Sequence, residues 1–415
     1  MRIDASKKLL RGLTWPQLMV LAVLLFSLLS YPFFLKFLFL SYYQAVQTVL
    51  VLILFVVCIV VPGGLHKTVV PSFVFYCCYI AMVTLSSLIN GIDAVTIKVM
   101  VSQYLKVGYL TLLLLSASKY FIHLSIHVYS CIVIFLSVLA ITLWLLVFLN
   151  LISPIGVISL SNEISGESQV RNNYGLGFLW FRQEVAGLYM SRVQSFSDEP
   201  GTFAYALIPA LFYSYYFLHK GFFILLLVTM LMTLSLGVVV PVLFLFVFIF
   251  DIKRFAVFLI LMGILAELTM SSFISEFLVN YVSGKFDGGE DVASYEARSD
   301  GVRAVIAKVS NTPLGFGFLA NKYVEGSIAN SLAISLLKGG VFGLAFYLAM
   351  LGTLLFKSVG LFRRGDRLAR VVVLTFVAML LGSFSRGELD ITFYQLWLLG
   401  SLMYMHSYRY RRELG

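Results

Sequence analysis

The sequence predicts an all-α, polytopic membrane protein with about twelve transmembrane helices. Only 12% of its 415 residues are charged and 60% are hydrophobic, and its mean hydropathy is +0.95. A soluble domain carries roughly a quarter of charged residues, so this chain has too few of them to cover a water-facing surface. Runs such as 222–250 are apolar without alternation. That pattern indicates helices and excludes a β-barrel.

The expected spans form a single transmembrane domain over residues 1–415. They lie at 14–34, 45–62, 69–90, 96–116, 126–152, 202–218, 221–235, 237–250, 255–272, 328–356, 371–386 and 390–407. The seventh and eighth spans are short and form one helical hairpin around Ser235-Leu236-Gly237. No small-x-small cleavage site follows the first apolar run, so we expect an uncleaved first span.

Basic residues orient this map. With both termini in the cytoplasm, the short cytoplasmic connections are rich in Lys and Arg, as in Arg363, Arg364 and Arg367, and the short outer connections hold few. This asymmetry is the positive-inside rule. The net charge of +10 is therefore mainly an orientation signal that contacts membrane lipids. It does not predict nucleic-acid binding.

Two segments, 153–201 and 273–327, are long, polar and external. We expect each to be a large periplasmic loop containing short amphipathic helices. An anionic external ligand is the simplest reason for their positive charge, although long loops are also translocated regardless of charge. The basic residues concerned are Arg171, Arg182, Arg192, Lys285, Arg298, Arg303, Lys308 and Lys322.

Residues 299–310 have the pattern of an amphipathic helix. Ser299 is expected as its N-cap, and Pro313 follows its end. Arg303 flanks the apolar stripe, Arg298 lies just before the helix, and a guanidinium binds phosphate with two parallel hydrogen bonds. The alternative is an interfacial helix whose arginines touch lipid phosphates. The expected stripe is Val302, Val305, Ile306 and Val309.

The first external segment ends in Asp198-Glu199-Pro200, directly before a span. Pro200 suits the first position of a helix, so Glu199 is expected at the N-cap, where a carboxylate complements the helix dipole. Glu199 is also a candidate general base for a sugar hydroxyl. The dipole and Arg192 would lower its pKa, whereas burial would raise it. Asp198 and Glu296 are the other candidate proton acceptors.

The remaining polar and aromatic residues carry weaker signals. The aromatic group in the first external segment is typical of a membrane-interface belt, with sugar stacking as the alternative. An ionisable residue inside a span usually has a function. The ones in this chain can instead lie near a helix end and extend their charged groups to the membrane surface. No metal or cofactor motif is present, and the cysteines lack metal-ligand spacing. The aromatic residues are Phe178, Trp180 and Phe181, and the ionisable residues within spans are Lys106, Glu267 and Lys338. The cysteines are Cys58, Cys77, Cys78 and Cys131.

Four short stretches, in this order and spacing, carry a family resemblance. The stretches are Arg192…Ser195-Phe-Ser-Asp-Glu-Pro-Gly201-Thr-Phe-Ala204, Thr233-Leu-Ser235-Leu-Gly237, Arg303…Pro313-Leu-Gly315-Phe-Gly317, and Asn330-Ser-Leu…Lys338-Gly-Gly-Val-Phe-Gly343. Together they make the chain similar to the bacterial O-antigen polymerase and ligase superfamily, the Wzy-type and WaaL-type membrane glycosyltransferases.

The resemblance implies a metal-independent, GT-C-like glycosyltransferase at the periplasmic face of the bacterial inner membrane. Its donor would be an undecaprenyl-diphosphate-linked oligosaccharide, and a chain-length regulator protein would be its partner. Arg192 and Arg303 would hold the diphosphate, with Glu199 as the catalytic carboxylate. Further substrate-binding residues would be Arg171, Arg182, Arg298, Asn330 and Asp198.

Two departures from the family pattern guide the choice within it. Many relatives, ligases above all, have histidine directly before the asparagine, whereas this chain has Ala329-Asn330. That difference favours a repeat-unit polymerase. The spacing from Arg303 to Gly315 also differs by one residue from a pattern seen in some polymerases. The alternatives are a ligase that transfers polymer to lipid A-core, and a lipid-linked glycan transporter or flippase, which should show internal repeats and discontinuous helices.

Overall fold

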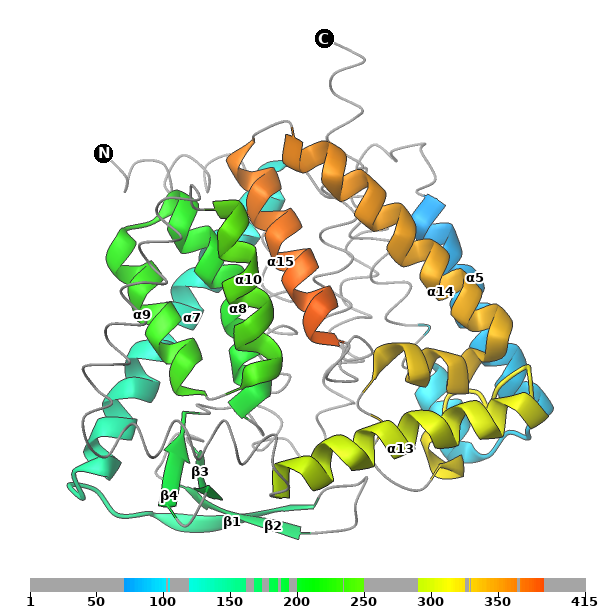
Figure 1. Cartoon of the computed structure of the whole chain (residues 1–415), viewed down its shortest axis with the longest axis horizontal. Coiled ribbons are helices and arrows are strands. Elements are labelled where there is room, and N and C mark those ends of the chain that lie inside the picture. Colours follow the sequence, from blue (N-terminus) through cyan, green and yellow to red (C-terminus); the bar gives the residue numbers. More distant parts are fainter. Residues whose placement is uncertain are drawn as a thin grey trace, which may run out of the picture.

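Helices dominate the structure, a computed structural model (Figure 1). It describes residues 71–101, 104, 119–161, 168–173, 179–185, 188–193, 200–233, 235–249, 290–324, 328, 330–363 and 366–383. The expected spans at 14–34, 45–62, 255–272 and 390–407, and most of 96–116, lie outside these residues.

Every expected span that falls within the described residues is a helix. Three helical stretches, Pro71–Ile89, Ile126–Val147 and Ser331–Arg363, are long and apolar enough to cross a membrane. The chain is therefore a helical membrane protein, and the number of twelve spans stays a prediction. The helices are α5 (Pro71–Ile89), α7 (Lys119–Phe148), α8 (Pro200–Phe217), α9 (Lys220–Met232), α10 (Leu236–Ile249), α14 (Ser331–Arg363) and α15 (Arg367–Ser383).

The short hairpin of α9 and α10 turns where the sequence places it. The side chain of His219 accepts a hydrogen bond from Gly221 N at 3.1 Å and so caps the start of α9. At the turn, Ser235 O accepts hydrogen bonds from Val238 N and Val239 N, at 3.0 and 2.9 Å. These bonds start α10 at Leu236, which confirms the expected boundary.

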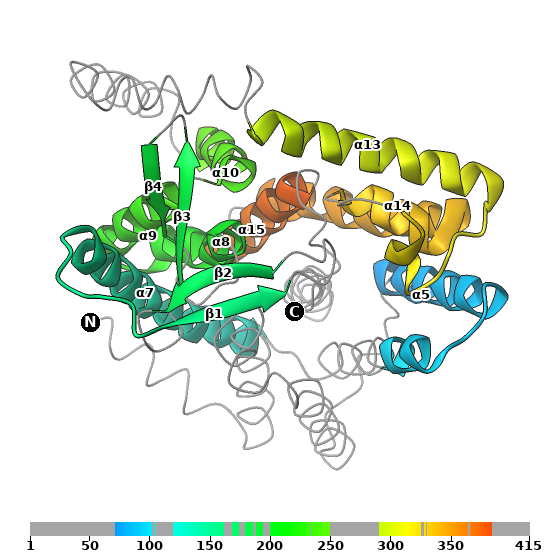
Figure 2. The same cartoon turned by 90° about the horizontal axis from the view of Figure 1, so that it is seen from below.

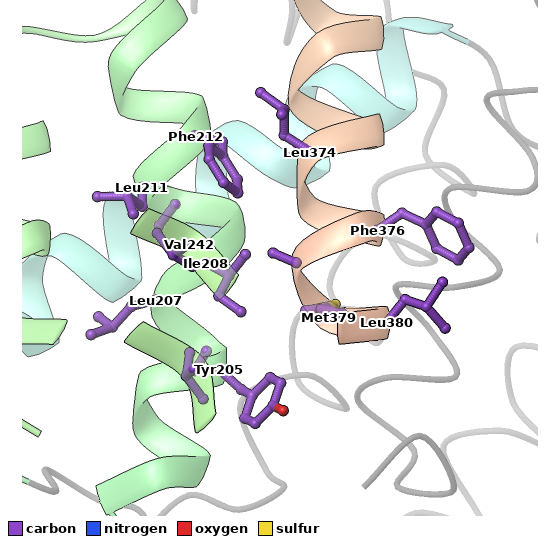
Figure 3. Packing of buried hydrophobic residues seen from close by; sticks show 14 of the residues in the cluster. Tyr205, Leu207, Ile208, Leu211, Phe212, Val242, Leu374, Phe376, Met379 and Leu380 are labelled. Carbon is purple, nitrogen blue, oxygen red and sulfur yellow. The ribbon is translucent and has the colours of Figure 1, made fainter. Parts of the chain in front are cut away.

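The main hydrophobic core surrounds α8. Its residues from Phe203 to Phe212 are almost fully buried, because α7, α9, α10 and α15 pack around it. Figure 3 shows Ile208 and Phe212 of α8 beside Val242 of α10 and Leu374 of α15. A helix that is apolar on all sides must be enclosed by protein or lipid. Here neighbouring helices enclose most of it.

A second packing unit joins α5 to α14 through glycine. A Cβ atom built on Gly339 would lie 3.5 Å from Cε2 of Tyr79, and one on Gly343 would lie 3.7 Å from its Cδ2. The ring of Tyr79 also lies 5.4 Å, centroid to centroid, from that of Tyr347. Small residues let two helices approach closely in a membrane, where packing rather than water drives association.

The segment 153–201 contains four β-strands, so the expectation of short amphipathic helices there is wrong. The strands are β1 (Gly156–Ser161), β2 (Ser168–Asn173), β3 (Leu179–Val185) and β4 (Leu188–Arg192), in the order β1-β2-β3-β4. All neighbouring pairs are antiparallel. Two features of the sequence account for them: β-branched and aromatic residues are frequent, and a two-residue connection suits the β3–β4 hairpin.

The strands and helix α13 (Glu290–Asn311) lie at the same end of the helical assembly, at the bottom of Figure 1. Figure 2 views this end directly, with the strands beneath α7, α8 and α9 and α13 beside α14. The ends at which α8 meets α9 and α14 meets α15 lie opposite, at the top of Figure 1. Both long segments thus lie at one end of the helical assembly, and the side of the membrane that this end faces stays a prediction.

Candidate functional site

Helix α13 is longer than the sequence pattern predicts. It runs from Glu290 to Asn311, so Ser299 lies inside the helix and is not its N-cap. Residues 290–298 are mostly strong helix formers, and acidic residues at 290 and 291 suit the positive end of the helix dipole. The helix does end before Pro313, as predicted.

One face of α13 packs on the first part of α14. Val305 and Val309 are buried in a small cluster with Ala333 and Leu337, and Val302 packs against its edge. Ile306, expected in the same stripe, is 56% exposed. The contact surface is narrower than the stripe: the buried residues that meet α13 come from the short first part of α14 and from residues 320–324.

Arg303 lies on the exposed surface of α13, with 79% of its side chain accessible. Its Nη1 lies 3.5 Å from Oδ1 of Asp300, whose side chain is also largely exposed. An exposed ion pair of this length contributes little. The guanidinium therefore keeps donors for an anion. Arg298 lies on the same helix.

Helix α14 is interrupted at Gly340, which has φ 65° and ψ −162°. An L residue adopts this conformation only with strain. A Cβ on Gly340 would also run into the carbonyl oxygen of Pro313. The break divides α14 into 331–339 and 341–363, and Figure 1 shows the short first part running along α13.

The loop Pro313–Phe318 fills the break with backbone hydrogen bonds. Phe316 N donates to Leu337 O at 2.8 Å, and Gly317 N donates to Lys338 O at 2.9 Å. Across the break, Val341 N donates to Pro313 O at 2.9 Å. These bonds satisfy polar groups that an interrupted helix leaves without partners. Two of the motif stretches that carry the family resemblance are thus in direct contact.

Glycine makes this contact possible. Gly315 and Gly317 have φ values of 81° and 82°. A Cβ on Gly315 would lie 2.7 Å from Lys338 O, and one on Gly317 would overlap Ser87. The glycines of this motif are explained by backbone approach and need no ligand to account for them.

Three polar residues at the end of α5 hold the other side of the loop, and sequence reasoning missed them. The Oγ of Ser86 donates to Leu314 O, Nδ2 of Asn90 donates to Gly315 O at 3.0 Å, and Phe318 N donates to Oγ of Ser87 at 2.9 Å. The available signal was a polar cluster closing an otherwise apolar span.

Asn330 caps the first part of α14. Its Oδ1 accepts hydrogen bonds from Leu332 N at 2.9 Å and Ala333 N at 3.2 Å. Asparagine is among the best N-cap residues. This position in the sequence therefore has a structural reason, and the predicted role in substrate binding stays a prediction.

The other predicted arginines lie on strands. Their backbone partners are Ile158 for Arg171, Ser191 for Arg182 and Phe181 for Arg192. Directly after β4, Val193 N donates to Met232 O at 3.1 Å, which ties the sheet to the end of α9. Asp198 and Glu199 lie outside the described residues. They immediately precede α8, which begins at Pro200 as predicted.

The structure thus places both arginine-bearing segments at one end of the molecule, but the strands and α13 lie against different helices. The strands, with Arg171, Arg182 and Arg192, lie beneath α7, α8 and α9. Helix α13, with Arg298 and Arg303, lies along α14 (Figure 2). Among the described residues, no group of three or more His, Cys, Asp or Glu side chains is arranged to hold a metal ion. Of the ionisable residues expected within spans, Lys338 lies at the break, and Lys106 and Glu267 lie outside the described residues.

These features define the class of protein: a helical membrane protein with a small sheet and a surface helix at one end. A scan against models of known protein families finds none that matches the chain. A search of curated proteins likewise finds no significant match. The resemblance to O-antigen polymerases and ligases therefore depends on the four motif stretches.

Proposed function

We propose that the chain is a membrane glycosyltransferase that polymerises undecaprenyl-diphosphate-linked repeat units of O-antigen or a related surface polysaccharide. The observation that carries the proposal is the exposed guanidinium of Arg303, held at the end of the molecule that also bears the arginine-containing strands. A largely free arginine at this place suits an anionic lipid headgroup.

The chemistry follows from the residue types. An acceptor hydroxyl attacks the anomeric carbon of the donor sugar, and the bond from that carbon to the diphosphate oxygen breaks. The diphosphate leaves with the electron pair, and Arg303 and Arg192 stabilise the charge that develops on it. Glu199 takes the hydroxyl proton. Guanidinium groups provide the charge that a metal ion would otherwise supply.

The proposed setting is the bacterial inner membrane, with both termini in the cytoplasm and the sheet and α13 in the periplasm. A chain-length regulator protein is the proposed partner. Labelling of single cysteines introduced at Ser159 and Ser310 with a membrane-impermeant maleimide tests this orientation, in a variant lacking the native cysteines. Labelling only after the membrane is opened would place the segments inside and end the proposal.

The activity test uses lipopolysaccharide banding in a deletion strain complemented with variants. Loss of the gene should leave core with a single repeat unit, and the wild-type chain should restore a ladder. Arg303→Ala should abolish most of the ladder, and Arg303→Lys should restore part of it because an ammonium lacks the two-pronged geometry. Lys308→Ala, on the same helix and also exposed, is the matched control and should retain the ladder.

A ligase would give a different band pattern. Its loss leaves bare core, with polymer stranded on the lipid carrier. The absence of histidine at position 329 is the reason to favour the polymerase. Unchanged banding in the deletion strain would exclude both enzymes.

The break in α14 favours a transporter as the second candidate, because transporters place substrates at discontinuous helices. Here, however, Phe316 N and Gly317 N already occupy the carbonyl groups of Leu337 and Lys338 at the break. Purified protein in liposomes separates the two functions. A polymerase lengthens lipid-linked glycan when donor and acceptor are supplied on one side, whereas a transporter moves unaltered glycan across the bilayer.

A further inference from the structure

The outer end of α5 lies outside the proposed catalytic residues, yet it makes a dense set of contacts with the second external segment. Ser86, Ser87 and Asn90 all bond to the backbone of the loop Pro313–Phe318. More than 220 positions separate the partners in the sequence. Local folding therefore does not account for these bonds.

The side-chain donors of two of these residues are all used. Asn90 has two amide hydrogens: Nδ2 donates to Ser86 O at 2.7 Å and to Gly315 O at 3.0 Å. The hydroxyl of Ser87 donates its one proton to Val83 O at 3.0 Å, which leaves its oxygen to accept from Phe318 N. One partner in each case is α5 itself and the other is the loop.

The fit is also steric. Ser87 is buried against Gly317, where any Cβ would overlap the serine. Beyond the loop, Nζ of Lys322 lies 3.6 Å from Oδ2 of Asp93, just past the end of α5. The segment 313–322 is therefore held along its length by the end of one helix.

This loop is the mechanical link between α13 and α14. The chain enters this loop from α13, which carries Arg303. On the α14 side, Val341 N donates a hydrogen bond to Pro313 O of the loop. Backbone hydrogen bonds of Phe316, Gly317 and Val341 join one side of the loop to α14. The side-chain bonds from the end of α5 fix the same loop from its other side.

We propose that Ser86, Ser87 and Asn90 are positioning residues that fix the loop Pro313–Phe318. Through this loop they place Arg303 where it can bind the lipid diphosphate. This inference rests on the proposed function for its consequence in catalysis. Its structural part, the hold of α5 on the loop, can be tested on its own.

Hydrogen exchange of the purified full-length protein tests the structural part. Asn90→Asp keeps the shape of the side chain but cannot donate to Gly315 O, and Ser87→Ala removes the acceptor for Phe318 N. Each should raise amide exchange in peptides covering 313–318 by about tenfold, the effect of losing one buried hydrogen bond. Ser137→Ala is the control, because Ser137 is buried and bonds only within α7. Unchanged amide exchange in both variants would show that these side chains of α5 do not fix the loop.

Kinetics in liposomes test the consequence for Arg303. Asn90→Asp should lower turnover about tenfold in the wild-type background, but less than about threefold in Arg303→Lys, because residues that act through one another are not additive. Equal losses in the two backgrounds, at equal amounts of inserted protein, would show a general structural role and overturn the positioning. Full activity in Arg303→Ala would instead refute the proposed function and leave the exchange result standing.

Discussion

The two segments at the end of the molecule that carries the sheet and α13 are stabilised in different ways. Strands β1 to β4 form an antiparallel sheet whose backbone groups pair among themselves, and Val193 joins it to α9. Residues 312–324 have no such ladder. Their backbone groups pair with α14 and with side chains of α5. Because backbone N–H and C=O groups must find partners when buried, a loop without a ladder depends on neighbouring helices for them.

The difference has a consequence for sequence. A sheet needs only residues that suit strands and tight turns, and many sequences satisfy that requirement. A loop that bonds backbone to backbone with a broken helix needs glycine at defined positions. Gly315, Gly317 and Gly340 meet that need, and they belong to the stretches that carry the family resemblance.

The largest expected effect is on the glycine junction. Gly340→Ala should lower the stability of the protein by about 3 kcal/mol or more, because it combines backbone strain with a clash against Pro313 O. The apparent melting temperature in detergent measures the change. Gly352→Ala is the matched control on the same helix, since nothing lies within 4 Å of a Cβ there. It should be neutral or stabilise by up to about 1 kcal/mol. Equal melting temperatures for the two variants would show that the contact between Gly340 and Pro313 does not require glycine.

The next effect separates the two segments by function. Arg303→Ala should lower polymerisation about 100-fold, which corresponds to the loss of two charge-assisted hydrogen bonds of about 1.5 kcal/mol each. Arg192→Ala should also lower it, as the second proposed diphosphate ligand. Rates with a lipid-linked repeat unit in liposomes measure both. If only one variant loses activity, the diphosphate is bound by one segment alone, and the proposed sharing of this role by both arginines is wrong.

A smaller effect is expected at the start of α14. Asn330→Ala removes the cap for Leu332 N and Ala333 N and should cost about 1 kcal/mol of stability. Asn330→Ser keeps a capping oxygen and should restore most of it. Melting temperature and activity are measured together. If serine restores stability but not activity, Asn330 contacts substrate in addition to capping the helix; if both recover, capping is its whole role.

The smallest effect is a pH dependence at Asp93, outside the spans. Hydrogen bonds from the Thr96 hydroxyl and backbone N–H, with nearby Lys322, hold the pKa of the Asp93 carboxyl below its ordinary value. A lowered pKa means that the carboxylate adds stability above the pKa of the unfolded chain. This contribution is lost as pH falls through the folded pKa. Asp93→Asn should melt slightly earlier than wild type at pH 7, and the difference should vanish in acid. A difference that persists in acid would argue against this origin.

Hydrophobic run length predicted the helices well, because crossing a bilayer demands a long apolar stretch whatever its neighbours are. The expected span 69–90 became α5 (Pro71–Ile89), and the hairpin turn near Ser235 was confirmed. The strands were missed because polar positions interrupt their short apolar runs. The start of α13 was misplaced because its first turns lack the apolar stripe, although they contain helix formers.

The candidate site was predicted only in part. Arg303 lies exposed on α13, as its position beside the apolar stripe implied. The roles of Ser86, Ser87 and Asn90 could not be predicted, because a hydrogen bond between α5 and a loop far along the chain leaves no local pattern. Asn330 was singled out for substrate, and the structure supplies a capping reason for it.

The interruption of α14 also changes how much of that helix is needed to traverse the lipid. The part after Gly340 extends to Arg363, about 23 residues, or roughly 35 Å at 1.5 Å per residue. That exceeds a hydrocarbon thickness of about 30 Å. The nine positions from Ser331 to Gly339 are therefore surplus to the crossing. They supply instead the surface on which α13 packs, because Ala333 and Leu337 are buried against Val305 and Val309.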